Sequence, residues 1–309
     1  MPTVFDSIEK QILSEVADLH DVPEGAYNIR VNGKSSARNS TANIEITSKE
    51  DGSGIDIKIK PNTKHESVHI PVVLSESGLS EVVYNDFFVG ENCDVVIVAG
   101  CGIHNCGTQN SEHDGVHRFY VGKGARVKYV EKHYGEGDGR AKRILNPTTE
   151  VYMEEDSTME MEMVQIEGVD STNRQTIAEV KKGASLVVRE RLMTSGDQVA
   201  VSGYTVKLCG EGAGADVVSR SVAKNHSHQT FESKIIGNCA CTGHTECDAI
   251  IMDSAKIDAI PSLEANHVDA SLVHEAAIGK IAGDQIIKLM TLGLTEKEAE
   301  EQIIAGFLK

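Results

Sequence analysis

Two periods of hydrophobic residues divide the 309-residue chain. Near the N-terminus apolar residues recur every three or four positions, which is the spacing of one helix face. These residues are Phe5, Ile8, Ile12, Val16 and Leu19. From about residue 43 the period changes to two, as in half-buried β-strands. Clear runs are Ile55, Ile57 and Ile59, then Val68, Ile70 and Val72, then Met159, Met161 and Met163. The pattern predicts one N-terminal helix followed by a long region of strands.

A longer repeat lies over the alternation. A small or turn-forming residue precedes each of six strand patterns, namely Asn92, Gly124, Asp156, Gly183, Gly212 and Ser254. The intervals between them are 32, 32, 27, 29 and 42 residues. A period of about 30 residues built only from strands and turns is typical of a β-solenoid, which is the fold we predict. A β-sandwich is the competing interpretation, because short strands at regular spacing fit that fold too.

The strand pattern ends after Val273, and DQIIKLMTLG and LTEKEAEEQIIAGFLK read as two short helices. Gly293 stands where a left-handed C-terminal cap belongs. Thr295 and Glu298 have the spacing of a capping box for the last helix. We therefore expect a helix and strands in residues 1–60, a solenoid core in 61–275 and a helical segment in 276–309.

The last helix carries an apolar stripe. Ala299, Ile303 and Phe307 lie four residues apart, and Ile304 widens the stripe. Such a stripe is expected to be buried, either against the end of the solenoid or against another protein.

The charge balance narrows the classes of partner. Lys and Arg number 30 against 47 Asp and Glu, a net charge of −17, so nucleic acid and membrane surfaces are poor partners. No segment approaches the roughly 20 apolar residues of a transmembrane helix, and the N-terminus does not resemble a signal peptide. The seven cysteines then read as reduced thiols of a cytoplasmic protein rather than as a disulfide framework.

Nucleotide-binding loops are absent from the sequence. In NIRVNGKSS, Asn28 stands where the first glycine of a Walker A loop should be, and no dinucleotide loop, nucleophile elbow or zinc-protease helix is visible. Any ATP-driven work would therefore need an ATPase on another chain.

The C-terminal third carries a family resemblance. GHTECDAIIM, AIPSLEA and VHEAAIGKIAGDQIIKLMTLGLTEKEAEEQIIAGFLK, in this order, resemble the core signature of the SufB/SufD family, the scaffolds of the SUF iron–sulfur cluster assembly machinery. The match covers roughly residues 90–309 and is similar to the compact archaeal-type members. It implies a right-handed parallel β-helix with short N- and C-terminal helical parts. It also implies a non-enzymatic scaffold that forms a homodimer, or a SufB/SufD-like heterodimer, through the β-helix. A SufC-like ABC ATPase would dock on the C-terminal helices.

One departure from the family pattern matters. The segment DSAKIDAIPSLEA carries no cysteine, and none follows Asp248, so a cluster cysteine cannot be carried over at that point. His274 and Glu275 match the family's His/Glu position at the dimer interface. The resemblance therefore implies an interfacial role for these two residues.

The candidate ligands combine soft and hard donors. Cys239, Cys241 and Cys247 would hold a transient iron–sulfur cluster, with His244 as a weaker ligand. Cys247, His274 and Glu275 would hold iron, and Glu264 could add a further oxygen ligand. Strand alternation would put Cys239 and Cys241 on one face, and Thr245 and Cys247 on one face. The alternative is that these small cysteines simply pack inside the solenoid.

A second candidate set lies in GCGIHNCG. Cys101, His104 and Cys106 include a C-x₄-C pair, which is an unusual ligand spacing, and the glycines suggest a turn between coils. These residues are either ligands or structural, and the nearby His113, Asp114 and His117 read as a solvated loop.

Two other functions remain open. A β-solenoid enzyme acting on carbohydrate needs aromatic platforms, and the chain offers no Trp, six Phe and seven Tyr. The other is a metal-free structural adaptor for the ATPase.

Overall fold

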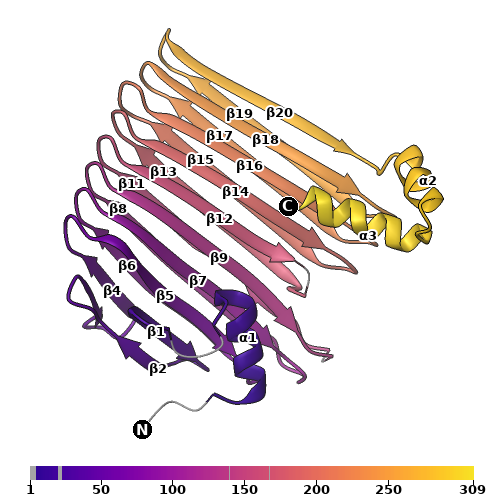
Figure 1. Ribbon diagram of the computed structural model, residues 1–309, viewed down its shortest axis with the longest axis horizontal. Coiled ribbons are helices and arrows are strands. Elements are labelled where there is room, and N and C mark those ends of the chain that lie inside the picture. The colour runs from indigo at the N-terminus through magenta and orange to yellow at the C-terminus, as the bar shows by residue number, and fades with distance from the viewer. Residues whose placement is uncertain (1–4, 20–22, 139, 167) are drawn as a thin grey trace.

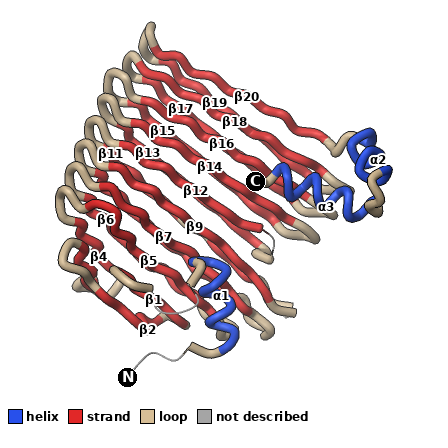
Figure 2. The backbone as a smooth tube through the Cα atoms, in the orientation of Figure 1, coloured by secondary structure: helices blue, strands red, loops and turns tan. Residues whose placement is uncertain are grey.

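The fold is a parallel β-solenoid of about eight turns. The computed structural model describes residues 5–19, 23–138, 140–166 and 168–309. One helix lies beside the N-terminal coils, and two helices follow the last strand and fold back along the side of the solenoid (Figures 1 and 2). The predicted solenoid is confirmed, and the β-sandwich alternative is excluded because the long ladders are parallel.

From β5 onward, the strands alternate between two ten-stranded sheets, here called sheet A and sheet B, except that β10 and β11 both belong to sheet B. Sheet A contains, in spatial order, β2 Lys34–Asn39, β1 Ala26–Val31, β5 Lys64–Leu74, β7 Asp94–His104, β9 Arg126–Glu136, β12 Thr158–Ile166, β14 Ser185–Thr194, β16 Gly214–Ala223, β18 Cys241–Ile251 and β20 Ala270–Gly279. Sheet B contains β19 Lys256–Ala265, β17 His228–Gly237, β15 Val199–Leu208, β13 Ser171–Val180, β10 Arg143–Leu145 with β11 Thr148–Met153, β8 Ser111–Val121, β6 Ser80–Val89, β4 Gly54–Ile59 and β3 Ile44–Ser48. Among the strands of the described residues, only the β1–β2 and β3–β4 pairs are antiparallel.

The core lies between the two sheets. Alternate residues of each strand point inward, and the parallel register stacks them in columns along the solenoid. Met161, for example, lies between Tyr129 and Val188 of the neighbouring coils, and all three are buried. The period-two pattern of the sequence is this division between core and solvent.

One edge of the solenoid carries a ladder of tight turns. Asn92, Gly124, Asp156, Gly183 and Gly212 all have a positive φ, between 53° and 74°, which glycine, asparagine and aspartate adopt most readily. The backbone N–H of each donates to a carbonyl of the next coil, over 2.8–3.0 Å. These five predicted turns are confirmed. Ser254 is an exception, because it follows β18 at the opposite edge. The ladder continues instead at Ala240, whose carbonyl accepts a hydrogen bond from the Gly212 N–H. The interval of 42 residues is long because it joins Gly212 to a turn at the opposite edge.

The N-terminal helix α1 (Ser7–Ala17) is confirmed and begins with a capping box between Asp6 and Glu9. Its Ile12 and Val16 are buried against sheet A. A Cβ at Gly102 of β7 would lie only 2.1 Å from Ile12 Cγ2, so this glycine lets the helix approach the sheet.

Both C-terminal helices are confirmed, as α2 (Gly283–Thr291) and α3 (Glu296–Phe307). Thr295 and Glu298 form the predicted capping box, and Gly293 has a φ of +100°. Ala299 and Ile304 of α3 are buried, and Ile304 packs with Met193 and Val222 of the solenoid. The stripe of α3 is therefore covered by the protein itself.

The helix α2 has no buried residue, and Ile287 and Met290 on it, with Leu292 just after it, are exposed. No helix within the described ranges is long and apolar enough to cross a membrane.

Candidate functional site

The solenoid is open at its C-terminal end. The last coil consists of β19 and β20, which pair with β17 and β18 along one edge each and have no partner strand on the other within the described chain (Figure 1). Ile260 and Val268 of this coil are 54% and 92% exposed. An open strand edge of this kind is a template for pairing with another chain.

Cys247 and His274 lie on the interior side of sheet A at this open end. Cys247 on β18 is fully buried, and its register neighbours are Ser219 and Ala276. His274 on β20 is half-buried and stands next to Thr245 of β18. The two predicted ligands are therefore diagonal neighbours on adjacent strands. Thr245 and Cys247 share the inner face, as expected from alternation.

Burial governs the chemistry of Cys247. Desolvation, followed by the nearby Glu190 carboxyl, raises the pKa of the Cys247 thiol to about 12. A thiol with such a pKa stays protonated at neutral pH and is a poor nucleophile. Loss of its proton would need a cation or a metal ion beside it.

Several polar atoms at this end have no hydrogen-bond partner among the described residues. They are His274 Nδ1, Thr245 Oγ1, Ser233 Oγ and Gln229 Oε1. His274 and Thr245 line sheet A, whereas Ser233 and Gln229 belong to β17 of sheet B. Buried polar groups in native proteins are normally satisfied by protein, water or ions, so these four atoms are free to bind a water molecule, an ion or another polar group at the open end.

The other two predicted thiols lie at the turn edge. Cys241 is buried at the start of β18, and Cys239 lies in the preceding turn, so the expectation of a shared strand face is wrong. Burial and then the neighbouring Cys241 raise the pKa of Cys239 to about 11. Cys241 and Cys247 are six residues apart on one strand, a separation of about 20 Å. Within one chain, Cys247 is therefore separate from the neighbouring thiols Cys239 and Cys241.

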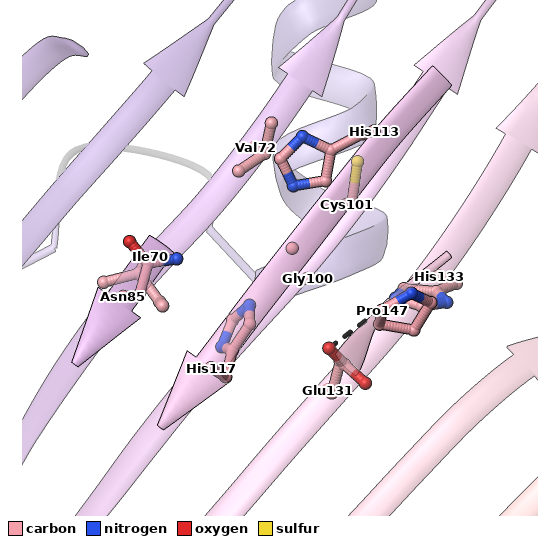
Figure 3. Close-up of a pocket in the computed structure, with 11 residues that line it drawn as sticks. Ile70, Val72, Asn85, Gly100, Cys101, His113, His117, Glu131, His133 and Pro147 are labelled. Atoms are coloured by element: carbon pink, nitrogen blue, oxygen red, sulfur yellow. Dashed lines mark ion pairs between the residues drawn. The ribbon is translucent and has the colours of Figure 1, made fainter. Parts of the chain in front are cut away.

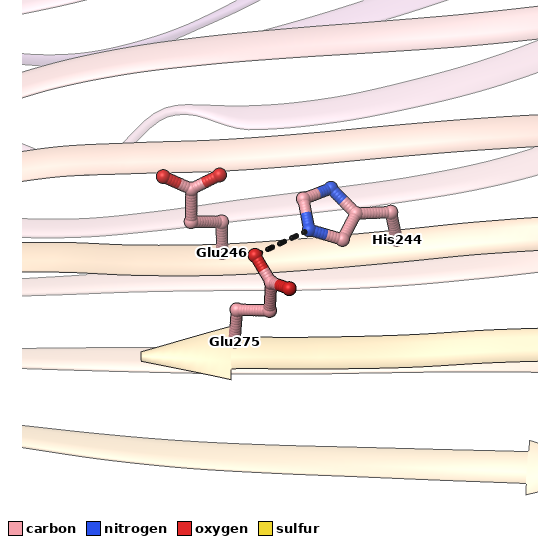
Figure 4. A group of neighbouring side chains, drawn as sticks. All are labelled: His244, Glu246 and Glu275. Carbon is pink, nitrogen blue, oxygen red and sulfur yellow. Dashed lines mark ion pairs between the residues drawn. The ribbon is translucent and has the colours of Figure 1, made fainter. Parts of the chain in front are cut away.

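The two glutamates lie on outer faces. Glu264 is on β19, where its carboxylate pairs with Lys234 Nζ at 2.5 Å. Glu275 follows His274 on β20 and so points outward, where its Oε2 lies 3.6 Å from His244 Nε2 (Figure 4). Strand alternation thus places His274 and Glu275 on opposite sides of sheet A.

A buried charge network, which the sequence pattern did not reveal, fills the middle of the solenoid. Arg174 on β13 forms an ion pair with Glu131 on β9 and lies 3.8 Å (Nε to Oε1) from Glu190 on β14. These side chains are 3%, 3% and 5% exposed. Burial alone would raise the pKa of the Glu131 carboxyl, but Arg174 and then His133 hold it well below its usual value. Glu131 is therefore ionised inside the core.

Hydroxyl groups extend the network toward Cys247. Ser202, Tyr204 and Ser219 donate to Glu190 over 2.6, 2.9 and 2.7 Å. Ser219 is the register neighbour of Cys247. A continuous series of buried polar groups thus links the middle of the solenoid to its open end.

The prediction of a solvated loop around His113 and His117 is wrong. Both lie on β8 with their rings inside, 5% and 6% exposed, beside a cavity of about 20 Å³ also lined by Cys101, Glu131 and His133 (Figure 3). Burial lowers the pKa of His117 to about 4, so its ring is neutral. A period of two, with Ser111, His113, Gly115, His117 and Phe119 on the inner face, runs along β8. This alternation is the signal in the sequence that predicts a strand with His113 and His117 buried.

The residues of GCGIHNCG do not form one site. Cys101 is buried on β7, and Cys106 is exposed in the loop after that strand. His104 lies between them, with Nδ1 3.0 Å from Glu136 Oε1 and Nε2 3.2 Å from Cys106 Sγ. The expected turn therefore starts only after His104.

Comparison with known proteins places the chain among assembly proteins. The SufBD core domain of the SUF system of iron–sulfur cluster assembly matches residues 77–307. An iron–sulfur cluster assembly SufBD family protein of Archaeoglobus fulgidus is 31% identical over 84% of this chain and 69% of its own length. Its counterpart in Methanocaldococcus jannaschii is 28% identical over 86% of this chain and 84% of its own length.

A third relative, from Methanothermobacter thermautotrophicus, is 29% identical over 82% of this chain, which spans only 62% of that protein. The core-domain match covers three quarters of the chain and includes the solenoid strands from β6 onward and both C-terminal helices. The chain belongs to the SufBD family of the SUF iron–sulfur cluster assembly system.

Proposed function

We propose that this protein is a non-enzymatic scaffold on which iron–sulfur clusters are assembled, at the open end of its solenoid. The observation that carries the proposal is the grouping of Cys247, His274 and unsatisfied polar atoms on the inner face of the last two coils. A thiol and an imidazole are ligands that iron–sulfur clusters accept. One chain supplies too few such donors there to hold a cluster alone.

A second copy would supply the missing donors. Two chains joined through their last coils would bury the exposed apolar residues and the free edges of β19 and β20. Each donor would then occur twice around one axis. A related SufB- or SufD-like chain would serve in the same way, so the cluster would form between subunits.

An ABC-type ATPase is the proposed second partner. The exposed apolar residues Ile287, Met290 and Leu292 on and after α2 offer it a docking surface, and α3 anchors that segment to the solenoid. Nucleotide binding by this ATPase would move the segment and change access to the open end. Co-purification of the ATPase with this protein should be lost in Ile287→Asp. It should be kept in Ile166→Asp, which alters an exposed residue of β12 on the outer side of the solenoid.

Anaerobic reconstitution with ferrous iron and sulfide tests the scaffold role. The wild-type protein should develop the visible absorbance of a cluster, and Cys247→Ser and His274→Ala should each reduce it strongly. Cys106→Ser, which removes an exposed thiol in the loop after β7, is the matched control. Equal spectra in all variants would exclude Cys247 and His274 as ligands.

The subunit interface is tested separately by light scattering. Leu272→Arg places a charge inside the last coil, and Ile177→Arg places the same charge on the side wall. We expect only the first to convert dimers to monomers. Dimers that persist in Leu272→Arg would place the interface elsewhere.

A further inference from the structure

The outer face of sheet A carries a second group of metal-binding side chains beside the open end. His244 and Glu246 lie two residues apart on β18, and Glu275 lies on the adjacent strand β20 (Figure 4). One donor atom from each of the three lies within 4.8 Å of the other two. Cys247 and His274 point to the opposite side of the same sheet, so this group is separate from the inner one.

His244 is oriented for coordination. Its Nδ1 lies 2.8 Å from Asp216 Oδ1, which fixes this nitrogen as the protonated one and leaves Nε2 directed toward Glu275. Metal-ligating histidines usually donate their second ring nitrogen to a carboxylate in this way. Asp216 is in turn held by Arg189, with Nη2 2.5 Å from Oδ2.

The two glutamates are like charges on neighbouring strands, with His244 paired to Glu275 at 3.6 Å and the positive charge of Arg220 acting on Glu246 from farther away. Glu246 and Glu275 are direct register neighbours on β18 and β20, an arrangement that is unfavourable for two carboxylates. The ion pairs of the described residues give neither of them a lysine or an arginine. A bound cation would relieve this repulsion.

We propose that His244, Glu246 and Glu275 form a site for one divalent first-row metal ion, with Asp216 as the residue that positions His244. Imidazole and carboxylate donors without thiolate suit Fe²⁺, Mn²⁺ and Zn²⁺. Donors at about 2.0–2.2 Å from such an ion are about 3–4 Å apart, so small side-chain rotations close the site. An open groove of about 480 Å³ connects the site to solvent; its lining includes Asp216, His244 and Glu246 and also the basic side chains Arg189, Arg191, Arg220 and Lys309.

The identity of the ion as iron rests on the proposed scaffold function, because a cluster scaffold must receive ferrous iron. The site itself does not depend on that function. Three protein ligands leave open coordination positions for water or another ligand, unlike the closed four-ligand set of a structural metal site.

Titration of the full-length chain with Mn²⁺ alone, followed by the loss of the free-ion EPR signal, tests the proposal. We expect one ion per chain in the wild type and at least about tenfold weaker binding in His244→Ala, Glu246→Gln and Glu275→Gln. Asp216→Asn should weaken binding by about 10–100-fold although Asp216 contributes no ligand atom. Anaerobic Fe²⁺ should compete with Mn²⁺ for the same site.

His228→Ala is the matched control, because His228 Nε2 pairs with Asp258 Oδ2 at 2.7 Å on the outer face of sheet B. This variant should bind Mn²⁺ as the wild type does, and circular dichroism should show all variants folded. Wild-type protein that binds no Mn²⁺ at millimolar concentration, or unchanged binding in His244→Ala and Glu246→Gln, would overturn the site. Failure of cluster reconstitution with intact Mn²⁺ binding would instead refute only the scaffold function.

Discussion

Replacement of Arg174 by methionine should strongly destabilise the solenoid. Arg174 is the cation nearest to two buried carboxylates, Glu131 and Glu190. Without it, Glu190 keeps three hydroxyl donors, but the polar partners that Glu131 keeps among the described residues are Tyr129 at 3.1 Å and His133 at 3.7 Å. The variant therefore leaves about one uncompensated buried charge, and removing one partner of a buried ion pair costs about 3–5 kcal/mol.

The loss should depend on pH. In the wild type the pKa of Glu131 is depressed, so its contribution to stability is complete above the ordinary carboxyl pKa and is lost only as the pH falls below it. In Arg174→Met, burial would instead raise the pKa of Glu131. Protonation then relieves the buried charge as the pH falls, so the destabilisation should be larger at pH 7 than at pH 5.

Urea denaturation at both pH values measures these effects, and hydrogen exchange of β9, β13 and β14 reports local opening, since repeat proteins do not always unfold in one step. Adding Glu131→Gln to Arg174→Met should restore most of the lost stability. Lys181→Met, which removes an exposed ion pair with Glu154, is the control and should cost less than about 1 kcal/mol. Wild-type stability in Arg174→Met, or no rescue by Glu131→Gln, would refute the reasoning.

Three further outcomes are expected. At pH 8, iodoacetamide should modify the exposed Cys106 and Cys209 rapidly and Cys247 only after unfolding, because burial raises the pKa of Cys247 to about 12; mass spectrometry of the labelled peptides checks this. Gly168→Ala should lower the melting temperature by several degrees, because a Cβ there would lie 1.9 Å from Gly135 O at a φ of +84°. Ile304→Asp should detach α3, which limited proteolysis detects as new cleavage in the C-terminal helices, with the solenoid left intact.

Local signals in the sequence were sufficient for much of the fold. The alternation of Met159, Met161 and Met163 defines a strand because one side of every coil is buried. Thr295 with Glu298 starts α3 because the capping box is closed by the helix's own residues. The assignment of Ser254 to the repeat was wrong, because turns at both edges of the solenoid use similar residues.

The interior could not be predicted in the same way. His113 and His117 are polar residues at inner positions, and their burial depends on Glu131 and Arg174, which lie on other coils. The number of residues per coil would have been enough to predict the outer group of His244, Glu246 and Glu275. From β18 to β20 this length is 29 residues, so Glu246 and Glu275 are register neighbours, and alternation then separates both from Cys247.

This separation has a mechanistic consequence. Because a strand directs successive side chains to opposite faces, Glu246 and Cys247 cannot serve one metal ion on a single sheet, and neither can His274 and Glu275. At the open end, the carboxylates Glu246 and Glu275 therefore lie on the outer surface and the Cys247 thiol on the inner one, with the backbone of sheet A between them. An ion held outside can reach the inner thiol only around the free edge of β20, which is the edge that a second chain would cover. In the proposed scaffold, opening and closing that seam would control both the entry of iron and the completion of the ligand set.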